Sequence, residues 1–380
     1  MKIGYAARWS PLDKGSWSGT SHYSYQQISN RYPVEVFTYK WPWYLREWMT
    51  TQKSLNRRLF KKQTSVEFLK AYAKYFCRQL DKDLRKRPVD LLFVSASPQL
   101  IAYLKTDIPV IFMIDATFQQ IQGYYPYFSN LASYNIQQGI ELDKRAFHRA
   151  DHCMLASEWN KNSAVKDYGI DSAKITVVPC GANLDRVPGK EELKEYDPDH
   201  CRLLFLGVDW ERKGGQIALD TFLLLKKQGL PVELTIVGCV PPPNAMINAE
   251  GITVIPFLDK NKAEDAERLH QLLLHTSFLL LPTRAECAGI VFGESSAYGV
   301  PSITTDTGGV TTYVRNGING FALPLSATAS DYAEKINALF LDKDQCTQMR
   351  LTARKTYAEL LNWDNWGTVF ARIAEGLTKK

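Results

Sequence analysis

The chain has 380 residues, of which 45% are hydrophobic and 23% are charged, and its formal net charge is +6. This length is too great for one hydrophobic core and favours two domains of roughly 180 residues each. No segment approaches the ~20 consecutive apolar residues of a transmembrane helix, so we expect no membrane-spanning segment.

The first half of the chain alternates short β-rich runs with longer helical stretches. We expect strands at Ile3–Arg8, Val34–Tyr39, Leu91–Ala96, Val110–Asp115, Cys153–Ala156 and Ile175–Pro179. The run Ile3–Arg8, at the start of the chain, is typical of a β-strand rather than of a signal peptide. Strands that alternate with helices indicate a parallel sheet covered by helices on both faces.

A glycine-containing loop, Lys14-Gly-Ser-Trp-Ser-Gly-Thr20, separates the first predicted strand from a helix expected to begin at Ser21. The glycine spacing matches neither the dinucleotide fingerprint nor a P-loop. Taken alone, the loop is equally compatible with a plain turn at the start of a helix.

The segment from Lys40 to Arg87 is strongly basic, with 14 Lys and Arg against four acidic residues, whereas the remaining chain carries a net charge of −4. Aromatic residues are interleaved with this charge, including Trp41, Trp43 and Trp48. Basic segments with Trp and Tyr are typical of contact with an anionic lipid surface. A solvated helical face remains an equal alternative, and nucleic-acid binding is less favoured because no recognisable motif accompanies the charge.

The second half repeats the alternating pattern after a charged segment, Pro188–Asp199, which we interpret as a linker. We expect strands at Leu203–Val208, Leu234–Gly238, Thr253–Phe257, Phe278–Leu281 and Ser302–Thr305. The predicted domains are residues 1–188 and 189–355, followed by a C-terminal helical segment, 356–380. Two α/β halves of this kind place a cleft at their interface, a common location for ligand sites.

The seven cysteines are odd in number and widely spaced, without a Cys-x-x-Cys pair. Several lie in apolar runs, where a thiol behaves as a small buried hydrophobe. This usage indicates a reducing compartment and no metal site, so we expect a cytosolic or cytosol-facing protein.

The stretch from Pro282 to Val310 carries the most informative pattern in the chain. Glu286 follows an apolar run typical of a buried parallel strand, and Glu294 opens a predicted helical patch that ends at Tyr298. Small residues between the two carboxylates allow backbone N–H groups to approach a ligand closely, and helix N-termini attract phosphate. Carboxylates that accept sugar hydroxyls beside N–H donors suit a nucleotide sugar.

The ordered string Glu286, Cys287–Gly289, Glu294, Gly299-Val-Pro301 and Gly308-Gly309 resembles the signature of the retaining glycosyltransferases of family 4. This resemblance implies the GT-B fold, an α/β architecture of two Rossmann-like doubly wound parallel-sheet domains that face each other across a cleft. It implies an N-terminal acceptor-side domain, a C-terminal nucleotide-sugar domain and a final helix that crosses back to the first domain.

The resemblance also assigns roles to individual residues. Glu286 and Lys213 are the implied catalytic residues, and Asp115 takes the strand-end position beside the anomeric carbon. The implied donor-binding residues are Arg212, Lys213, Glu286, Ala288, Gly289, Ile290, Glu294, Gly181 and Asn183. The loop over the transferred sugar and acceptor is implied to include Ser18, Gly19 and Thr20.

The chain departs from the family pattern at two positions. Val208 stands where the family has an Arg, and Arg212 is a candidate to supply the missing charge. Asp115 stands where many members have a His; an Asp there could accept a hydroxyl hydrogen bond or cap the following helix.

The resulting expectation is a retaining hexosyltransferase that moves a sugar from a UDP- or GDP-sugar to a sugar or lipid-linked acceptor in surface polysaccharide or glycolipid synthesis. No cofactor and no metal are expected. The alternatives are a GT-B sugar-nucleotide epimerase and a non-catalytic nucleotide-sugar-binding subunit. A dinucleotide-dependent dehydrogenase is disfavoured because the Gly-x-Gly-x-x-Gly fingerprint is absent.

Overall fold

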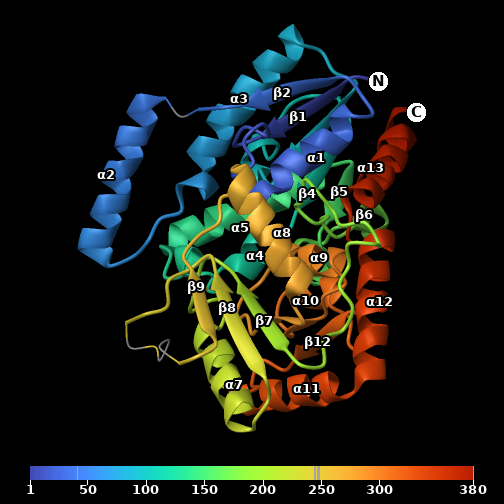
Figure 1. The fold of residues 1–380 in the computed structure, drawn as a ribbon. Coiled ribbons are helices and arrows are strands. Elements are labelled where there is room, and N and C mark those ends of the chain that lie inside the picture. The colour runs from blue at the N-terminus through green and yellow to red at the C-terminus, as the bar shows by residue number, and fades with distance from the viewer. Residues whose placement is uncertain (41, 244, 246–248, 380) are drawn as a thin grey trace. The chain divides into compact units, whose positions relative to one another are not determined.

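The computed structural model describes residues 1–40, 42–243, 245 and 249–379, and the chain divides into two compact units (Figure 1). Unit 1 comprises Met1–Pro179 with Trp366–Lys380, and unit 2 comprises Cys180–Asn365. The predicted division lay at residues 188 and 189, within a segment that has no regular secondary structure. Each unit is built on its own six-stranded parallel sheet, which confirms the predicted α/β class.

The sheet of unit 1 has the strand order β2-β1-β3-β4-β5-β6. The strands are β1 (Ile3–Ala7), β2 (Val34–Thr38), β3 (Leu91–Ser95), β4 (Val110–Ile114), β5 (His152–Leu155) and β6 (Ile175–Val177). The helices are α1 (Thr20–Ser29), α2 (Trp43–Phe60), α3 (Lys70–Lys86), α4 (Phe118–Ile121), α5 (Ser133–Arg149) and α6 (Glu158–Tyr168). Each predicted strand is present, with ends that differ by one to two residues.

Side chains that alternate along the strands bury both faces of this sheet. On β3, Leu92 and Val94 join the hydrophobic core formed with α3 and α5. Phe93 points to the opposite face, where its ring packs edge-on against Trp366 and Phe370 of α13 (Trp363–Thr378) at 5.7 and 5.5 Å between centroids. The last part of α13 therefore belongs to the core of unit 1.

The sheet of unit 2 has the order β12-β11-β10-β7-β8-β9. Its strands are β7 (Cys201–Leu206), β8 (Val232–Val237), β9 (Ile252–Ile255), β10 (Phe278–Leu281), β11 (Ser302–Thr305) and β12 (Gly320–Leu323). Its helices are α7 (Gly215–Lys227), α8 (Ala263–His275), α9 (Ile290–Ala297), α10 (Val310–Tyr313), α11 (Ala329–Leu341) and α12 (Lys343–Glu359), followed by the start of α13. Strand β12 was not predicted, because four residues that begin with a glycine carry little strand signal.

The chain reverses its direction of progress across this second sheet between β7 and β10. From β7 it proceeds through β8 to β9, and it then returns to place β10 on the other side of β7. In open α/β sheets, ligands bind outside the carboxyl ends of the strands at such a switch point. The loops that follow β7 and β10 are therefore the expected ligand-binding loops of unit 2.

Candidate active site

The two loops at the switch point of unit 2 bring together the predicted catalytic lysine and glutamate. Lys213 follows β7 and Glu286 follows β10, and the Lys213 Nζ donates to Glu286 Oε2 in a buried ion pair. The guanidinium of Arg212 lies 3.7 Å from the same carboxylate oxygen and also donates to the Ala285 carbonyl at 3.1 Å. Two cations therefore converge on the Glu286 carboxylate, and the guanidinium of Arg212 also pairs with Asp209 at 3.5 Å.

The turn that carries Lys213 depends on glycine. Gly214 has φ +74°, and a Cβ at this position would lie 2.0 Å from the Pro282 carbonyl oxygen. Gly207 is also constrained, because a Cβ there would lie 2.8 Å from Cγ of Lys213. Gly214 therefore lets the turn after β7 approach the β10 loop closely, and Gly207 leaves room for the Lys213 side chain. This close approach sets the position of Lys213.

Glu286 is held through its backbone by the loop after β11. The N–H of Gly309 donates to the Glu286 carbonyl at 3.0 Å. Three residues later Gly289, with φ +86°, is the N-cap of α9, and no side chain caps the first turn of this helix. Ala288, Gly289 and Ile290, the predicted backbone donors, thus lie at a helix N-terminus without a side-chain cap, where the helix dipole favours an anion.

The helix that contains Glu294 is longer than predicted. It begins at Ile290, so Glu294 lies in the second turn rather than the first, with its side chain buried. Its carboxylate pairs with the ammonium of Lys260, which comes from the loop after β9 and also lies 3.4 Å from the Asn183 carbonyl. Lys260 was not predicted, because a single lysine in an irregular segment carries no recognisable pattern.

Gly181 and Asn183, the remaining predicted donor residues of unit 2, contact the segment before and at the start of α13. A Cβ on Gly181 would lie 2.4 Å from the backbone nitrogen of Trp363. The Trp363 indole N–H donates to Asn183 Oδ1 at 2.9 Å, and the N–H of Ala182 donates to the Leu361 carbonyl at 3.0 Å. The side-chain oxygen of Asn183 is therefore already engaged within unit 2.

Asp115 lies in unit 1 directly after β4, and its side chain is half-buried. The loop around it is fixed by Asn160, whose amide donates to the Ile114 carbonyl at 2.8 Å, and by Thr117. Thr117 forms a capping box with Gln120, so Thr117 rather than Asp115 caps the following helix. The helix-cap alternative for Asp115 is thus wrong, and its predicted role toward a hydroxyl stays a prediction.

The predicted acceptor loop follows β1 in unit 1. Ser18 is exposed and has φ +54°, and Gly19, with φ +90°, is the N-cap of α1. Thr20 is the first residue of α1, one residue before the predicted start, and its carbonyl accepts a hydrogen bond from the Ser24 hydroxyl at 2.7 Å. Of Ser18, Gly19 and Thr20, only Ser18 is exposed, so its hydroxyl is the one that lies at the surface of this loop.

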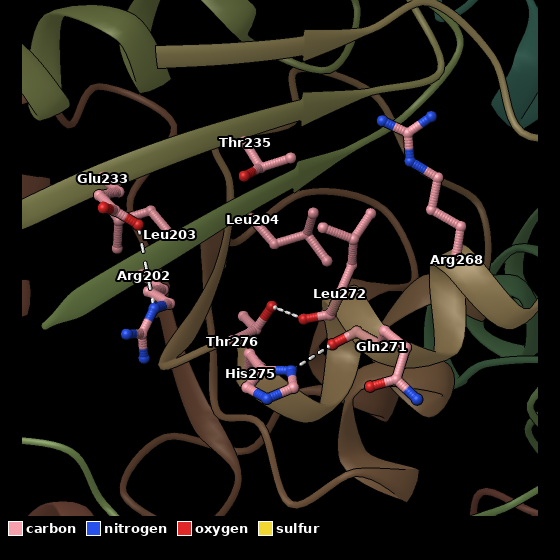
Figure 2. A pocket seen from close by; sticks show the side chains of 10 residues that line it. All are labelled: Arg202, Leu203, Leu204, Glu233, Thr235, Arg268, Gln271, Leu272, His275 and Thr276. Atoms are coloured by element: carbon pink, nitrogen blue, oxygen red, sulfur yellow. Dashed lines mark hydrogen bonds and ion pairs between the residues drawn. The ribbon is translucent and has the colours of Figure 1, made fainter. Parts of the chain in front are cut away.

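A separate groove in unit 2 lies at the other end of the strands, near the amino ends of β7 and β8 (Figure 2). Arg202, Glu233 and Thr235 line its strand side, and Arg268 and His275 of α8 line the other. Arg202 already pairs with Asp197 at 2.9 Å. This end of the strands carries none of the residues that the sequence assigned to the site.

Among the residues described, no group of three or more His, Cys, Asp or Glu side chains is placed to hold a metal ion. None of the helices in that same part of the chain is both long and apolar enough to cross a bilayer.

Two family models match the chain in succession. One is described as "Glycosyltransferase Family 4" and matches residues 22–186, and the other is described as "Glycosyl transferases group 1" and matches residues 200–342. The matched ranges fall largely within unit 1 and unit 2, respectively.

Curated relatives include two D-inositol 3-phosphate glycosyltransferases. The protein from Nocardia farcinica is 28% identical over 255 residues, which cover 62% of this chain and 53% of the relative. The protein from Gordonia bronchialis is 25% identical over 244 residues, which cover 59% and 52%. The chain thus spans about half the length of the curated relatives it matches.

Solved structures share the fold over the whole chain. A glycosyltransferase from Rickettsia africae has a TM-score of 0.66 at 15% identity and covers 100% of this chain and 99% of that one. Anabaena HepE, solved in complex with UDP, has a TM-score of 0.65 at 14% identity and full coverage of both chains. At such identity the likeness shows the fold, which is that of the GT-B glycosyltransferases.

Proposed function

The chain belongs to the family 4 glycosyltransferases, and we propose that it moves a hexose from a nucleoside diphosphate sugar to an acceptor hydroxyl with retention of anomeric configuration. The observation that carries this proposal is the buried Lys213–Glu286 pair beside Arg212 at the switch point of unit 2. Two cations beside a helix N-terminus that no side chain caps suit a diphosphate.

In the proposed reaction the bond between the anomeric carbon and the diphosphate oxygen breaks, and a bond from that carbon to the acceptor oxygen forms. Lys213 and Arg212 stabilise the negative charge that develops on the leaving diphosphate, an electrostatic contribution that is often the largest in such sites. The departing phosphate takes the acceptor proton, so no separate general base is assigned. Glu286 orients the sugar toward the acceptor, and Asp115 accepts a hydrogen bond from a sugar or acceptor hydroxyl.

The donor contacts follow from the same loops. The N–H groups of Ala288, Gly289 and Ile290 hold the sugar and phosphate. Glu294, whose carboxylate is paired with the Lys260 ammonium, accepts hydrogen bonds from the ribose hydroxyls. Uridine is the preferred carrier, since Anabaena HepE, a protein of the same fold, is described in complex with UDP and with UDP and glucose. No cofactor and no metal take part in the proposed reaction.

The acceptor belongs to surface polysaccharide or glycolipid synthesis, and the protein works at the cytosolic face of an anionic membrane. The support for this location is α2, within the basic segment from Lys40 to Arg87. Figure 1 shows α2 standing away from the sheet of unit 1, and Trp43, Leu59 and Phe60 are exposed on it. Trp41, also assigned to this surface, lies outside the described residues. A basic helix with exposed aromatic residues fits the headgroup region of an anionic leaflet.

Nucleotide binding and product stereochemistry test the proposal together. UDP or UDP-sugar at a hundred times its dissociation constant stabilises a protein by about 2.7 kcal/mol, which a thermal-shift screen against UDP-, GDP- and other nucleotide sugars detects. NMR of the product then reports the anomeric configuration. A β-linked product from an α-linked donor would refute retention, and binding without transfer to any acceptor pool would favour the non-catalytic alternative. An epimerised product from donor alone would favour the epimerase.

A further inference from the structure

Unit 1 has its own switch point, between β1 and β3. The chain passes from β1 to β2 on one side and then places β3 on the other side of β1. The loops after the two strands meet here, because the N–H of Arg8 donates to the Ser97 hydroxyl at 3.0 Å. In open α/β sheets, ligands bind outside the carboxyl ends of the strands at such a switch point. The loops after β1 and β3 are therefore a ligand-binding position of unit 1, as the loops after β7 and β10 are in unit 2.

Backbone strain is concentrated in the loops after β1 and β3. Trp17 and Ser18, in the loop after β1, have φ of +47° and +54°, and Ala96, in the loop after β3, has φ of +44°. A non-glycine residue in the left-handed region costs of order 1–3 kcal/mol, and such residues cluster at functional sites. The strain therefore marks the two loops that meet at Arg8.

Arg8 is the centre of a polar and aromatic cluster. Its guanidinium pairs with the carboxylate of Glu67 on the 3₁₀ turn Val66–Phe68, and each side chain is 21% exposed. The guanidinium also lies over the Trp9 ring, 4.5 Å from the centroid. Tyr127 is linked to the Arg8–Glu67 pair through its neighbour Phe128, whose ring packs against that of Phe68, the residue after Glu67. The cluster of Arg8, Trp9, Glu67 and Tyr127 is called the Arg8 cluster below.

The aromatic members of the Arg8 cluster remain open to solvent although the residues behind them are packed. Trp9 is 46% exposed and Tyr127 is 50% exposed. Tyr127 packs edge-on against Phe128 at 4.8 Å, and Phe128 in turn packs against Phe68 at 5.9 Å. Tyr127 is thus an exposed ring held on a packed aromatic base, and Trp9 is an exposed ring that stacks on the Arg8 guanidinium. Rings fixed in this way bind a ligand at low entropic cost.

We propose that the Arg8 cluster is an acceptor subsite for an uncharged pyranose ring. This inference rests on the proposed transferase function and names the class of its acceptor. The exposed faces of Trp9 and Tyr127 would cover the apolar C–H face of the sugar. The partly exposed Arg8–Glu67 pair places guanidinium N–H donors beside carboxylate acceptors, which suits adjacent sugar hydroxyls.

The charges of the Arg8 cluster discriminate between acceptor classes. Arg8 is neutralised by Glu67, so the cluster attracts no net anion, and the carboxylate would repel a phosphate. An inositol phosphate, the acceptor in the names of the curated relatives, is therefore disfavoured at this position. A lipid tail is disfavoured as well, because it would bury an ion pair without satisfying its hydrogen bonds.

Saturation-transfer NMR on the full chain tests this subsite. The probes are the methyl α- and β-glycosides of glucose, galactose, mannose and N-acetylglucosamine, with myo-inositol 1-phosphate as the charged rival, all in the presence of UDP. We expect at least one methyl glycoside to bind, and Trp9→Ala and Tyr127→Ala each to weaken it by about tenfold. Trp9→Phe, which keeps an aromatic face, should recover part of that loss. The control is Tyr134→Ala, which removes an exposed ring of the same unit that contacts Thr64 instead.

The outcomes separate this inference from the proposed function. UDP affinity reports the donor site and should stay within about twofold in all variants. If no glycoside binds, or if Trp9→Ala and Tyr127→Ala bind like the control, the subsite is refuted even when UDP binds. Binding of myo-inositol 1-phosphate that Trp9→Ala weakens would refute the uncharged class. Failure of UDP to bind to the wild type would instead refute the proposed donor function.

Discussion

The backbone N–H of Arg284 donates a hydrogen bond to the carbonyl oxygen of Arg212 at 2.7 Å. The Thr283 hydroxyl donates to the same carbonyl at 3.2 Å. The loop after β10 is therefore joined to the loop after β7 through the backbone, and not only through the ion pair between Lys213 and Glu286. Because these groups are short and fixed, the separation of the two charged side chains does not depend on the flexible lysine alone.

Substitution of Gly214 by alanine should break this junction. A Cβ would meet the Pro282 carbonyl at 2.0 Å, in addition to the cost of φ +74°. Gly229→Ala is the matched control, since Gly229 has φ +83° and nothing within 4 Å of an added Cβ. We expect the control to lose about 1 kcal/mol of unfolding free energy and Gly214→Ala to lose clearly more, together with nucleotide binding. Calorimetry measures both losses, and equal destabilisation would argue against the tight junction.

Removal of either member of the buried pair should abolish most transfer. Lys213→Ala removes the charge proposed to face the leaving diphosphate, and Glu286→Ala removes the sugar contact and leaves Lys213 and Arg212 without their carboxylate. We expect kcat to fall at least about 10²–10³-fold in each variant. Glu211→Ala, an exposed neighbour in the same turn, should keep wild-type turnover. Circular dichroism checks that the fold persists, and wild-type-like turnover in either site variant would reject its role.

The bond between Asn183 and Trp363 should act as a stabilising unit. Both side chains are buried, so Trp363→Phe removes the indole hydrogen bond to Asn183 and should cost about 1–3 kcal/mol of unfolding free energy. Asn183→Ala should cost a similar amount, and the double variant little more than either. Additive losses would show that the two residues act independently. The KM for donor, measured in the same variants, tests the predicted donor contact of Asn183.

The sequence was sufficient to predict the six strands of the first sheet and five of the six strands of the second. It assigned Lys213 and Glu286 to one site, but it did not predict the ion pair between them. Fully buried parallel strands such as β10 are continuous apolar runs, and the loops that follow them carry fixed motif spacings. Arg212, which the sequence offered as a replacement for the cation missing at Val208, reaches the Glu286 carboxylate, whereas Val208 itself is 67% exposed.

Features that depend on tertiary contacts were not visible in the sequence. Helix α9 starts at Ile290 because Gly289 caps it in the left-handed conformation, although the residues that follow have no preference for a helix start. The pairing of Lys260 with Glu294 joins segments that are 34 residues apart in the chain. The boundary at residues 179 and 180 is set by which unit each backbone packs against, and composition does not record it.

Anionic lipid should recruit the protein if α2 meets a membrane surface. Within α2 four Lys and Arg stand against one acidic residue, Glu47, so the attraction should weaken as salt screens it. We expect flotation with phosphatidylserine vesicles at low salt, loss at about 0.5 M salt, and none with phosphatidylcholine alone. Trp43→Ala with Phe60→Ala should reduce flotation further, because these exposed rings supply apolar contact. Failure to float with anionic vesicles at low salt would leave a solvated helical face as the better interpretation.

Asp143 should make the stability of unit 1 depend on pH. This fully buried carboxyl accepts a hydrogen bond at 2.5 Å from the N–H of Phe118, the first residue of α4, and burial raises its pKa to about 7. In the unfolded chain an Asp releases its proton near pH 4. Between about pH 4 and pH 7 the folded state therefore binds more protons, and the stability from Asp143 falls as pH rises. Asp143→Asn keeps a side-chain oxygen for Phe118 but cannot ionise, so it should remove this slope. Urea unfolding at several pH values measures the difference between the two proteins, and parallel curves would contradict the assigned titration.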